Sequence, residues 1–174
     1  MEPSSPLIAI VMGSDSDLPT LAAAAQVCDQ FGIPYQVQIL SAHRTPEAML
    51  EFARSAHTQG IRVIIAGAGG AAHLPGMVAA LTPLPVIGVP VVSKHLQGVD
   101  SLYSIVQMPR GIPVATVAIG NGQNAGLLAV QILASADPDL LQQVIAYRER
   151  LKQSVQQKNT QLQAQGWKAY LEGR

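Results

Sequence analysis

Short runs of consecutive apolar residues alternate along this chain with longer segments in which apolar residues recur every three or four positions. The first run, Leu7–Met12, is apolar throughout and ends at Gly13. An unbroken apolar run of this length is typical of a strand that is covered on both faces, as in a parallel sheet. Four later segments also predict strands, over Tyr35–Leu40, Arg62–Ala66, Val86–Val89 and Val114–Ile119.

The segments between these runs have helical spacing. Leu18–Phe31 is followed by Gly32, a residue that commonly ends helices. Thr45-Pro46-Glu47 is a start signal, with a capping residue, a proline in the first turn and an acid near the positive helix end. The remaining helices are expected from this start to about Gln59, over roughly Leu74–Leu81, through Val106 after a polar stretch Ser93–Asp100, and over Asn124–Ser135.

This alternation predicts an α/β fold with one domain. We expect a three-layer sandwich in which a five-stranded parallel sheet has helices on both faces and right-handed crossovers. The expected strand order is the flavodoxin-like order 2-1-3-4-5. Asn124–Ser135 is so rich in alanine and leucine that it should be buried nearly all round.

The C-terminal part of the chain has a different composition. Apolar residues recur at helical spacing among Gln, Lys and Arg from Pro138 to Gly166, which predicts a long final helix with one narrow apolar stripe. Such a helix would dock on its own body or on a neighbouring subunit. We therefore assign residues 1–166 to a single α/β catalytic domain and expect 167–174 to be a disordered tail.

The composition narrows the class of protein. Of the 174 residues 48% are hydrophobic and only 13% are charged, which excludes extensive disorder and hints at surface buried between subunits. Lys plus Arg and Asp plus Glu both number 11, so the formal net charge is zero. The protein therefore has no net positive charge that would attract nucleic acid or an anionic membrane. The single Cys28 fits a reducing compartment, and neither an export signal nor a membrane-spanning run is apparent. We expect a cytoplasmic protein.

The predicted strand order places the loops after the first three strands side by side. Ligands of such sheets bind beyond the carboxyl ends of the strands, near the point where the order reverses. The same loops are the most polar and glycine-rich parts of the sequence. We therefore look for the functional residues there.

The first loop, Gly13–Asp17, contains two serines and two aspartates. Hydroxyls and backbone amides at a helix N-terminus can hold a phosphate, and a carboxylate beside them suits the vicinal hydroxyls of a ribose. The alternative is that Ser16 and Asp17 only cap the following helix. The spacing leaves both interpretations open.

The second loop reads Ser41-Ala42-His43-Arg44-Thr45-Pro46. Arg44 offers a planar set of donors that suits phosphate. His43 titrates near neutral pH and can both take and give a proton. A lone loop histidine is commonly solvated or structural, but its place beside an arginine at the functional edge favours an acid–base role.

The third loop, Gly67–His73, superficially resembles a dinucleotide fingerprint. A true fingerprint follows the first strand and precedes an acidic residue at the end of the second, whereas this loop follows the third strand. No phosphate-loop lysine pattern is present either. The glycines are better explained as letting backbone amides approach a flat ligand. His73 could contact that ligand or be structural, and His57 and His95 are expected to be bystanders.

Two other chemistries have weaker support. The four histidines are far apart and lack the spacing of metal ligands, so no metal site is expected. A nucleophilic relay of Ser41, His43 and Asp17 is conceivable, although no nucleophile elbow is present. The residues alone thus predict a phosphorylated sugar ligand, one acid–base histidine, no metal and no nicotinamide.

Four motifs in this order closely resemble one enzyme family. They are Gly13–Asp17, Ser41–Pro46, Ala66–Gly76 and Gly98–Val114. Over residues 7–135 the chain resembles the 5-(carboxyamino)imidazole ribonucleotide mutases, the catalytic subunit of microbial phosphoribosylaminoimidazole carboxylase in purine biosynthesis. The presence of Thr45 directly after Ser41–Arg44 resembles the mutase branch of the family rather than the animal branch, which uses free carbon dioxide. Gly120–Ala125 is shorter and the final helix longer than the family pattern, which leaves local loop geometry open.

The resemblance implies an isomerase that moves the carboxyl group of N-carboxyaminoimidazole ribonucleotide to ring carbon C4 by decarboxylation and recarboxylation. It implies His43 as the proton carrier, a homo-octamer, and no ATP, metal or biotin. The substrate-binding residues that it implies are Ser14, Ser16, Ser41 and Arg44 for the phosphate, Asp17 for the ribose, and Gly69 and His73 around the migrating carboxyl group. Two alternatives stay open: a carboxylase that uses free carbon dioxide, and a non-catalytic phosphate- or nucleotide-binding module.

Overall fold

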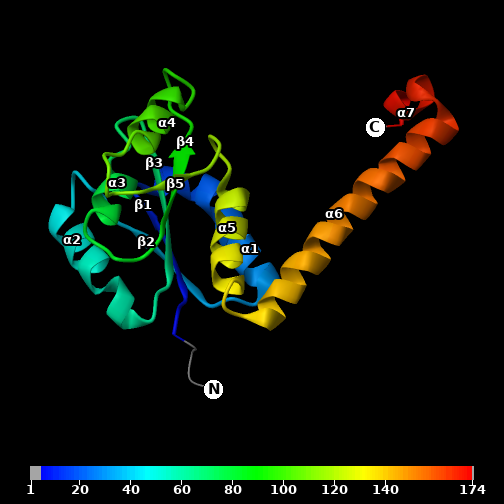
Figure 1. Ribbon diagram of the computed structural model, residues 1–174. Helices are drawn as coiled ribbons and strands as arrows, with labels where there is room; N and C mark the ends of the chain where they lie inside the picture. Colours follow the sequence, from blue (N-terminus) through cyan, green and yellow to red (C-terminus); the bar gives the residue numbers. More distant parts are fainter. Residues whose placement is uncertain (1–4, 174) are drawn as a thin grey trace.

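A five-stranded sheet lies between two layers of helices in the computed structural model, which describes residues 5–173 (Figure 1). All strand pairs are parallel, and the order β2-β1-β3-β4-β5 confirms the predicted topology. Residues 1–4 and 174, which the sequence analysis assigned to the domain and to the tail, lie outside the described residues. The strands are β1 Ile8–Met12, β2 Tyr35–Ile39, β3 Val63–Gly69, β4 Val86–Val91 and β5 Ala115–Thr116.

The helices cover the two faces of the sheet unequally. Helices α1 and α5 pack on one face, whereas α2, α3 and α4 pack on the other (Figure 1). Alternate residues of a strand point to opposite faces, so Ile10 joins the first core and Val11 the second. The helices are α1 Leu18–Phe31, α2 Pro46–Ser55, α3 Leu74–Ala79, α4 Val99–Val106, α5 Gly122–Ala134, α6 Pro138–Gln165 and α7 Trp167–Glu172, with 3-10 turns η1 Asp15–Asp17 and η2 Ala56–Gln59.

Strand β3 is longer than predicted. It was expected to end at Ala66, but it continues to Gly69 because its last three residues pair with the end of β4. Gly67 is therefore a strand residue, and a Cβ atom there would collide with the Leu21 side chain of α1. Close packing between β3 and α1 explains this glycine, whereas the sequence analysis had attributed it to ligand approach.

Strand β5 is shorter than predicted, with two residues instead of the six of Val114–Ile119. The chain still runs beside β4, since the Gly120 amide donates to the Pro90 carbonyl at 2.8 Å. The N–H and C=O groups of one strand residue point to the same side. The Pro90 carbonyl points toward the β5 segment, so the N–H that proline lacks would have pointed there too, and Pro90 offers that segment no donor. Regular pairing in which both strands donate and accept therefore ends before Pro90, which keeps β5 short.

Helix α5 is covered on most of its surface. Ala125, Ala129 and Val130 are buried, and Leu127 and Leu128 are partly buried against the same core. The expectation that this helix would be buried nearly all round is confirmed from Ala125 onward, because α1 and α6 both pack against it; only Gln123 and Asn124 in its first turn are exposed.

Helix α6 begins against α5 and then projects away from the body (Figure 1). Its 28 residues make it about 42 Å long. Only Leu140 and Val144, near its start, are buried. Residues expected to form a disordered tail include the short helix α7, which contacts α6; the state of this tail in solution stays a prediction.

The only cysteine of the chain is buried in the core. Cys28 on α1 is fully buried, and burial raises the pKa of its thiol to about 11, so the thiol has a structural role. None of the helices within residues 5–173 has the length and apolar content needed to cross a bilayer.

Candidate active site

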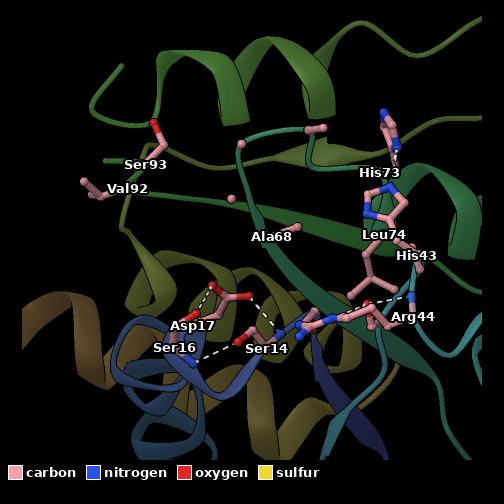
Figure 2. A pocket seen from close by; sticks show the side chains of 16 residues that line it. Ser14, Ser16, Asp17, His43, Arg44, Ala68, His73, Leu74, Val92 and Ser93 are labelled. Carbon is pink, nitrogen blue, oxygen red and sulfur yellow. Dashed lines mark hydrogen bonds between the residues drawn. The ribbon is translucent and has the colours of Figure 1, made fainter. Parts of the chain in front are cut away.

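A cavity of about 350 Å³ opens at the carboxyl ends of the strands, where the strand order reverses. Every residue that the sequence analysis selected lines it: Ser14, Ser16, Asp17, Ser41, His43, Arg44, Gly69 and His73. Figure 2 shows the two histidines at one side, the serine-rich first loop below, and Val92 and Ser93 at the opposite side. The predicted juxtaposition of the first three loops is therefore present in one chain.

The first loop closes on itself in a capping box. The Ser14 hydroxyl accepts from the Ser16 amide at 3.3 Å, and the Asp17 carboxylate accepts from the Ser14 amide at 3.2 Å. Asp17 thus takes part in capping the turn η1, which runs directly into α1, although at the N-cap of α1 itself it makes no side-chain cap bond. A ligand-binding role of Ser16 and Asp17 stays a prediction. The box caps the 3-10 turn η1 and leaves the Ser16 side chain exposed beside the cavity.

Asp17 is the buried acid of this loop, with 8% of its surface exposed. Burial raises the pKa of its carboxyl group above the usual value, and the hydrogen bond from the Ser14 amide opposes this rise. A carboxylate held in this way can accept hydrogen bonds from ligand hydroxyls without having to reorganise.

The second loop is fastened by two side chains. Thr45 was expected to cap α2, but its hydroxyl instead accepts from the Ser41 amide at 3.0 Å and donates to the Ser41 carbonyl at 3.2 Å. Arg44 donates to the Ser41 hydroxyl at 3.4 Å and to the Gly13 carbonyl at 3.2 Å. The guanidinium thus ties the end of β2 to the end of β1 while it lines the cavity.

The two histidines of the cavity contact each other. His43 Nε2 lies 2.7 Å from His73 Nδ1, and the two rings meet edge to face at 84°. One of these nitrogens must carry the proton of the hydrogen bond and the other must accept it. Both side chains are exposed to the open side of the cavity. The pair can therefore pass a proton to or from a ligand.

The loop after β4 also reaches the cavity, which the sequence analysis had not expected. Val92 and Ser93 line it, and the Ser93 hydroxyl donates to Asp100 at 2.6 Å. This hydrogen bond lowers the pKa of the Asp100 carboxyl group. The available signal was the strand order itself, because the fourth strand is next to the third and must end at the same edge.

The structure removes some alternatives. His43 bonds to His73, and the Ser41 hydroxyl accepts from the Arg44 amide at 3.1 Å, so no nucleophilic relay of Ser41, His43 and Asp17 is formed. His57 and His95 are exposed and do not line the cavity. Within residues 5–173 no cluster of three or more His, Cys, Asp or Glu side chains is arranged to hold a metal ion.

The arrangement suits an elongated ligand. Hydroxyl, guanidinium and amide donors for an anion lie at one side, and small apolar residues such as Ala42 and Ala68 form part of the wall. The imidazole pair lies at another side (Figure 2). A ligand with a phosphate at one end and a flat ring at the other would place that ring beside His43 and His73.

Comparisons with known proteins agree on one family. The AIR carboxylase family profile matches residues 7–154. An N5-carboxyaminoimidazole ribonucleotide mutase from Synechocystis is 68% identical over 99% of this chain and 98% of its own length. A mutase of the same name from Pyrococcus horikoshii is 56% identical over 98% of this chain and 97% of its own length.

Two further matches are a longer protein and a solved structure. The phosphoribosylaminoimidazole carboxylase of Schizosaccharomyces pombe is 60% identical over 95% of this chain, but the match covers only 30% of that protein. The crystal structure of PurE from Treponema denticola superposes with a TM-score of 0.83 at 31% identity, over 90% of this chain and 98% of the other.

Proposed function

This chain belongs to the AIR carboxylase family, and we propose that it is a mutase that converts N5-carboxyaminoimidazole ribonucleotide into 4-carboxy-5-aminoimidazole ribonucleotide in purine biosynthesis. Mutases of that name match it at 56–68% identity over nearly the whole of both chains. The structural observation that carries the proposal is the His43–His73 pair, which shares one cavity with the serine- and arginine-lined anion site.

The reaction needs one group that first gives and then takes a proton. When the carbamate C–N bond breaks, carbon dioxide leaves and the exocyclic nitrogen gains a proton. Ring carbon C4 then attacks the carbon dioxide, a C–C bond forms, and C4 loses its hydrogen to restore aromaticity. Substrate and product are isomers, so the protons balance. We assign both transfers to the His43 imidazole, which ends in its starting state.

The remaining cavity residues hold the ribonucleotide. The hydroxyls of Ser14, Ser16 and Ser41 and the guanidinium of Arg44 are assigned to the phosphate, and the Asp17 carboxylate to the ribose hydroxyls. Anchoring both groups fixes the distance between the ring and His43, which turns proton transfer into a reaction within one complex.

Gly69 and His73 are assigned to the space around the migrating carboxyl group. Carbon dioxide must be recaptured by C4 faster than it escapes. In a single chain this space is open, because His43, Gly69 and His73 are all exposed. Neighbouring subunits could cover it, and we propose the homo-octamer that the family resemblance implies.

The exposed apolar side chains of α6 support assembly. Leu141, Ile145 and Leu151 of α6 have 43–52% of their surfaces exposed. Exposed apolar side chains repeated along one helix in this way are typical of subunit interfaces. We also propose a cytoplasmic location, since the single cysteine is a buried free thiol, as expected in a reducing compartment.

A carboxylase is the second candidate, favoured by the name and 60% identity of the Schizosaccharomyces pombe relative. Such an enzyme would use aminoimidazole ribonucleotide and free carbon dioxide. The two reactions give the same product but differ in the origin of its carboxyl carbon.

A labelling experiment distinguishes the candidates. Unlabelled carbamate substrate is supplied with carbon-13 bicarbonate, a metal chelator and no ATP, and the enzyme-free reaction is subtracted. A mutase transfers the original carboxyl group, so the product stays essentially unlabelled. Labelling at the rate of turnover would identify the carboxylase, and ribonucleotide binding without product would identify a binding module.

A further inference from the structure

A hydroxyl outside the cavity connects three backbone segments that meet behind it. Ser101, in the first turn of α4, is fully buried. Its hydroxyl donates to the Val91 carbonyl at the end of β4 at 2.7 Å and accepts from the Gly70 amide at 2.9 Å. One oxygen thus joins α4, the end of β4 and the turn after β3.

A second serine of α4 holds the other side of the same glycine. The Ser104 hydroxyl donates to the Gly70 carbonyl at 3.2 Å, and the Ala72 amide donates to that carbonyl at 2.9 Å. Gly70 has a φ of +68°, a left-handed conformation that other residues seldom adopt. Both backbone polar groups of this left-handed glycine are therefore bonded to side chains from one helix.

This turn leads directly to the imidazole pair. Gly70, Ala71 and His73 line the cavity. Only two residues lie between Gly70 and His73 in the sequence. The His73 amide donates to the Ala71 carbonyl at 2.9 Å, which makes the segment a tight turn. The Gly70 turn is thus joined by a short segment to His73, whose ring contacts His43 at 2.7 Å.

We propose that Ser101 and Ser104 are positioning residues of the mutase reaction, which hold the Gly70 turn so that His73 stays against His43 and Gly69 and His73 keep their places around the carboxyl group. This inference rests on the proposed function. Neither serine lines the cavity, so both act through the turn and not on the substrate.

The chemistry of the two sites decides which substitutions are informative. Ser101 uses its hydroxyl as donor and acceptor at once, and alanine would leave the buried Val91 carbonyl and Gly70 amide without these partners. Ser104 provides one bond to a carbonyl that keeps its second donor, so Ser104→Ala is the milder change. Ser101→Thr retains the hydroxyl and tests for rescue.

The experiment compares Ser104→Ala with Ser135→Ala, which also removes a serine-to-carbonyl bond but at the exposed end of α5. We expect kcat of Ser104→Ala to fall about 5- to 10-fold, the effect of one neutral hydrogen bond. The KM should stay within about two-fold, since the anchoring loops are untouched. Carbon-13 from bicarbonate should enter the product more than in wild type. Kinetics and labelling equal to those of Ser135→Ala would overturn the inference, as would a change in KM alone.

A second readout does not depend on turnover. In NMR spectra of the folded protein, the ring signals of His43 and His73 should shift in Ser104→Ala and in Ser101→Ala, and much less in Ser101→Thr. The His57 ring, which is exposed on η2, is the internal reference. Unchanged His43 and His73 signals in folded Ser104→Ala would contradict the positioning role. An inactive wild type would instead disprove the proposed function, and these spectra would still test the turn.

Discussion

Asp17 shows how a residue that we assign to ligand binding can oppose the stability of the chain. Its carboxyl group is buried in the first loop, and burial raises its pKa in the folded state. Between the unfolded and folded pKa values the folded state binds more protons than the unfolded state. The contribution of Asp17 to the free energy of unfolding therefore falls as the pH rises from the unfolded to the folded pKa. At higher pH the buried carboxylate destabilises the folded state by a constant amount.

The substitution Asp17→Asn tests this balance. We expect a higher free energy of unfolding at neutral pH than in wild type, and a difference that vanishes as pH falls below 3.8, the unperturbed value. The KM for the ribonucleotide should rise by about 10- to 100-fold if the carboxylate holds the ribose.

Urea unfolding between pH 3 and pH 7 measures the first effect, with Asp15→Asn in the same turn as the control for loss of a charge. An Asp17→Asn variant that is less stable at neutral pH would refute the assignment of burial as the dominant cause.

His43 carries the second residue-scale prediction. His43→Asn removes the titrating ring, so kcat should fall by about 10²- to 10⁴-fold, the usual range for a general acid–base. Ribonucleotide affinity should change little because the anion donors lie in other side chains. Steady-state rates and calorimetric titration measure both quantities, and His57→Asn is the matched control. Near-wild-type turnover in His43→Asn would exclude the proton-carrier role.

Residue identities at the site were predictable, but several of their bonds were not. The position of a loop at the carboxyl edge of the sheet was sufficient to select Ser14, Asp17 and His43. The sequence analysis gave Thr45 a capping bond, yet its hydroxyl binds the Ser41 backbone. Such choices depend on distances of a few tenths of an ångström between competing partners, which residue types and spacing do not encode.

At the scale of elements, the crossing of α1 and α5 sets a steric limit. A Cβ atom on Gly126 would lie 2.8 Å from Val27 Cβ and 3.0 Å from the Ala24 carbonyl oxygen. Alanine in a helix is favoured over glycine by about 1 kcal/mol. Overpacking costs typically about 1–3 kcal/mol, and the backbone of α1 has little freedom to move away.

We therefore expect Gly126→Ala to lower the free energy of unfolding by about 1 kcal/mol or more, despite the gain in helix propensity. Urea denaturation provides the measurement. The control is Gly173→Ala, where the nearest atom to the new Cβ would be the Ala169 carbonyl oxygen at 3.6 Å. A stabilised Gly126→Ala variant would show that the two helices can separate at no cost.

The existence and order of the elements followed from the sequence, whereas some of their ends did not. Hydrophobic runs identified all five strands, but pairing partners decided where β3 and β5 stop. Pro90 was visible in the sequence, yet its effect on β5 required knowledge of which neighbour its missing N–H would face. Strand ends thus depend on contacts between segments that are distant along the chain.

At the scale of the whole molecule, α6 leaves apolar side chains exposed well beyond the body of its own chain. Leu151 and Val155 lie one turn apart with 52% and 65% of their surfaces exposed. The sequence predicted an apolar stripe on this helix. It left open whether the stripe packs on the body of its own chain or on a neighbouring subunit. The single chain covers only the beginning of the helix, which favours the second choice.

The double variant Leu151→Asp, Val155→Asp should dissociate the proposed octamer, because burying two carboxylates in an apolar interface is strongly unfavourable. Light scattering should then give a mass near 18.3 kDa or a small multiple of it. Gln153→Asp, on the opposite face of the helix, should leave the mass unchanged. An intact octamer in the double variant would place the interface elsewhere.

The anion donors of the cavity already have partners within the protein. The Ser16 amide is bonded to Ser14, and the Arg44 guanidinium to Ser41 and Gly13. A phosphate at the Ser16 amide would displace that amide's bonds to the Ser14 hydroxyl and the Asp15 carboxylate, whereas at Arg44 it could use guanidinium N–H groups that the bonds to Ser41 and Gly13 leave over. Its net gain at Ser16 is therefore small, and most of the attraction would come from Arg44. Free inorganic anions have neither sugar nor base to add to that gain, so they should compete poorly with a nucleotide for this cavity.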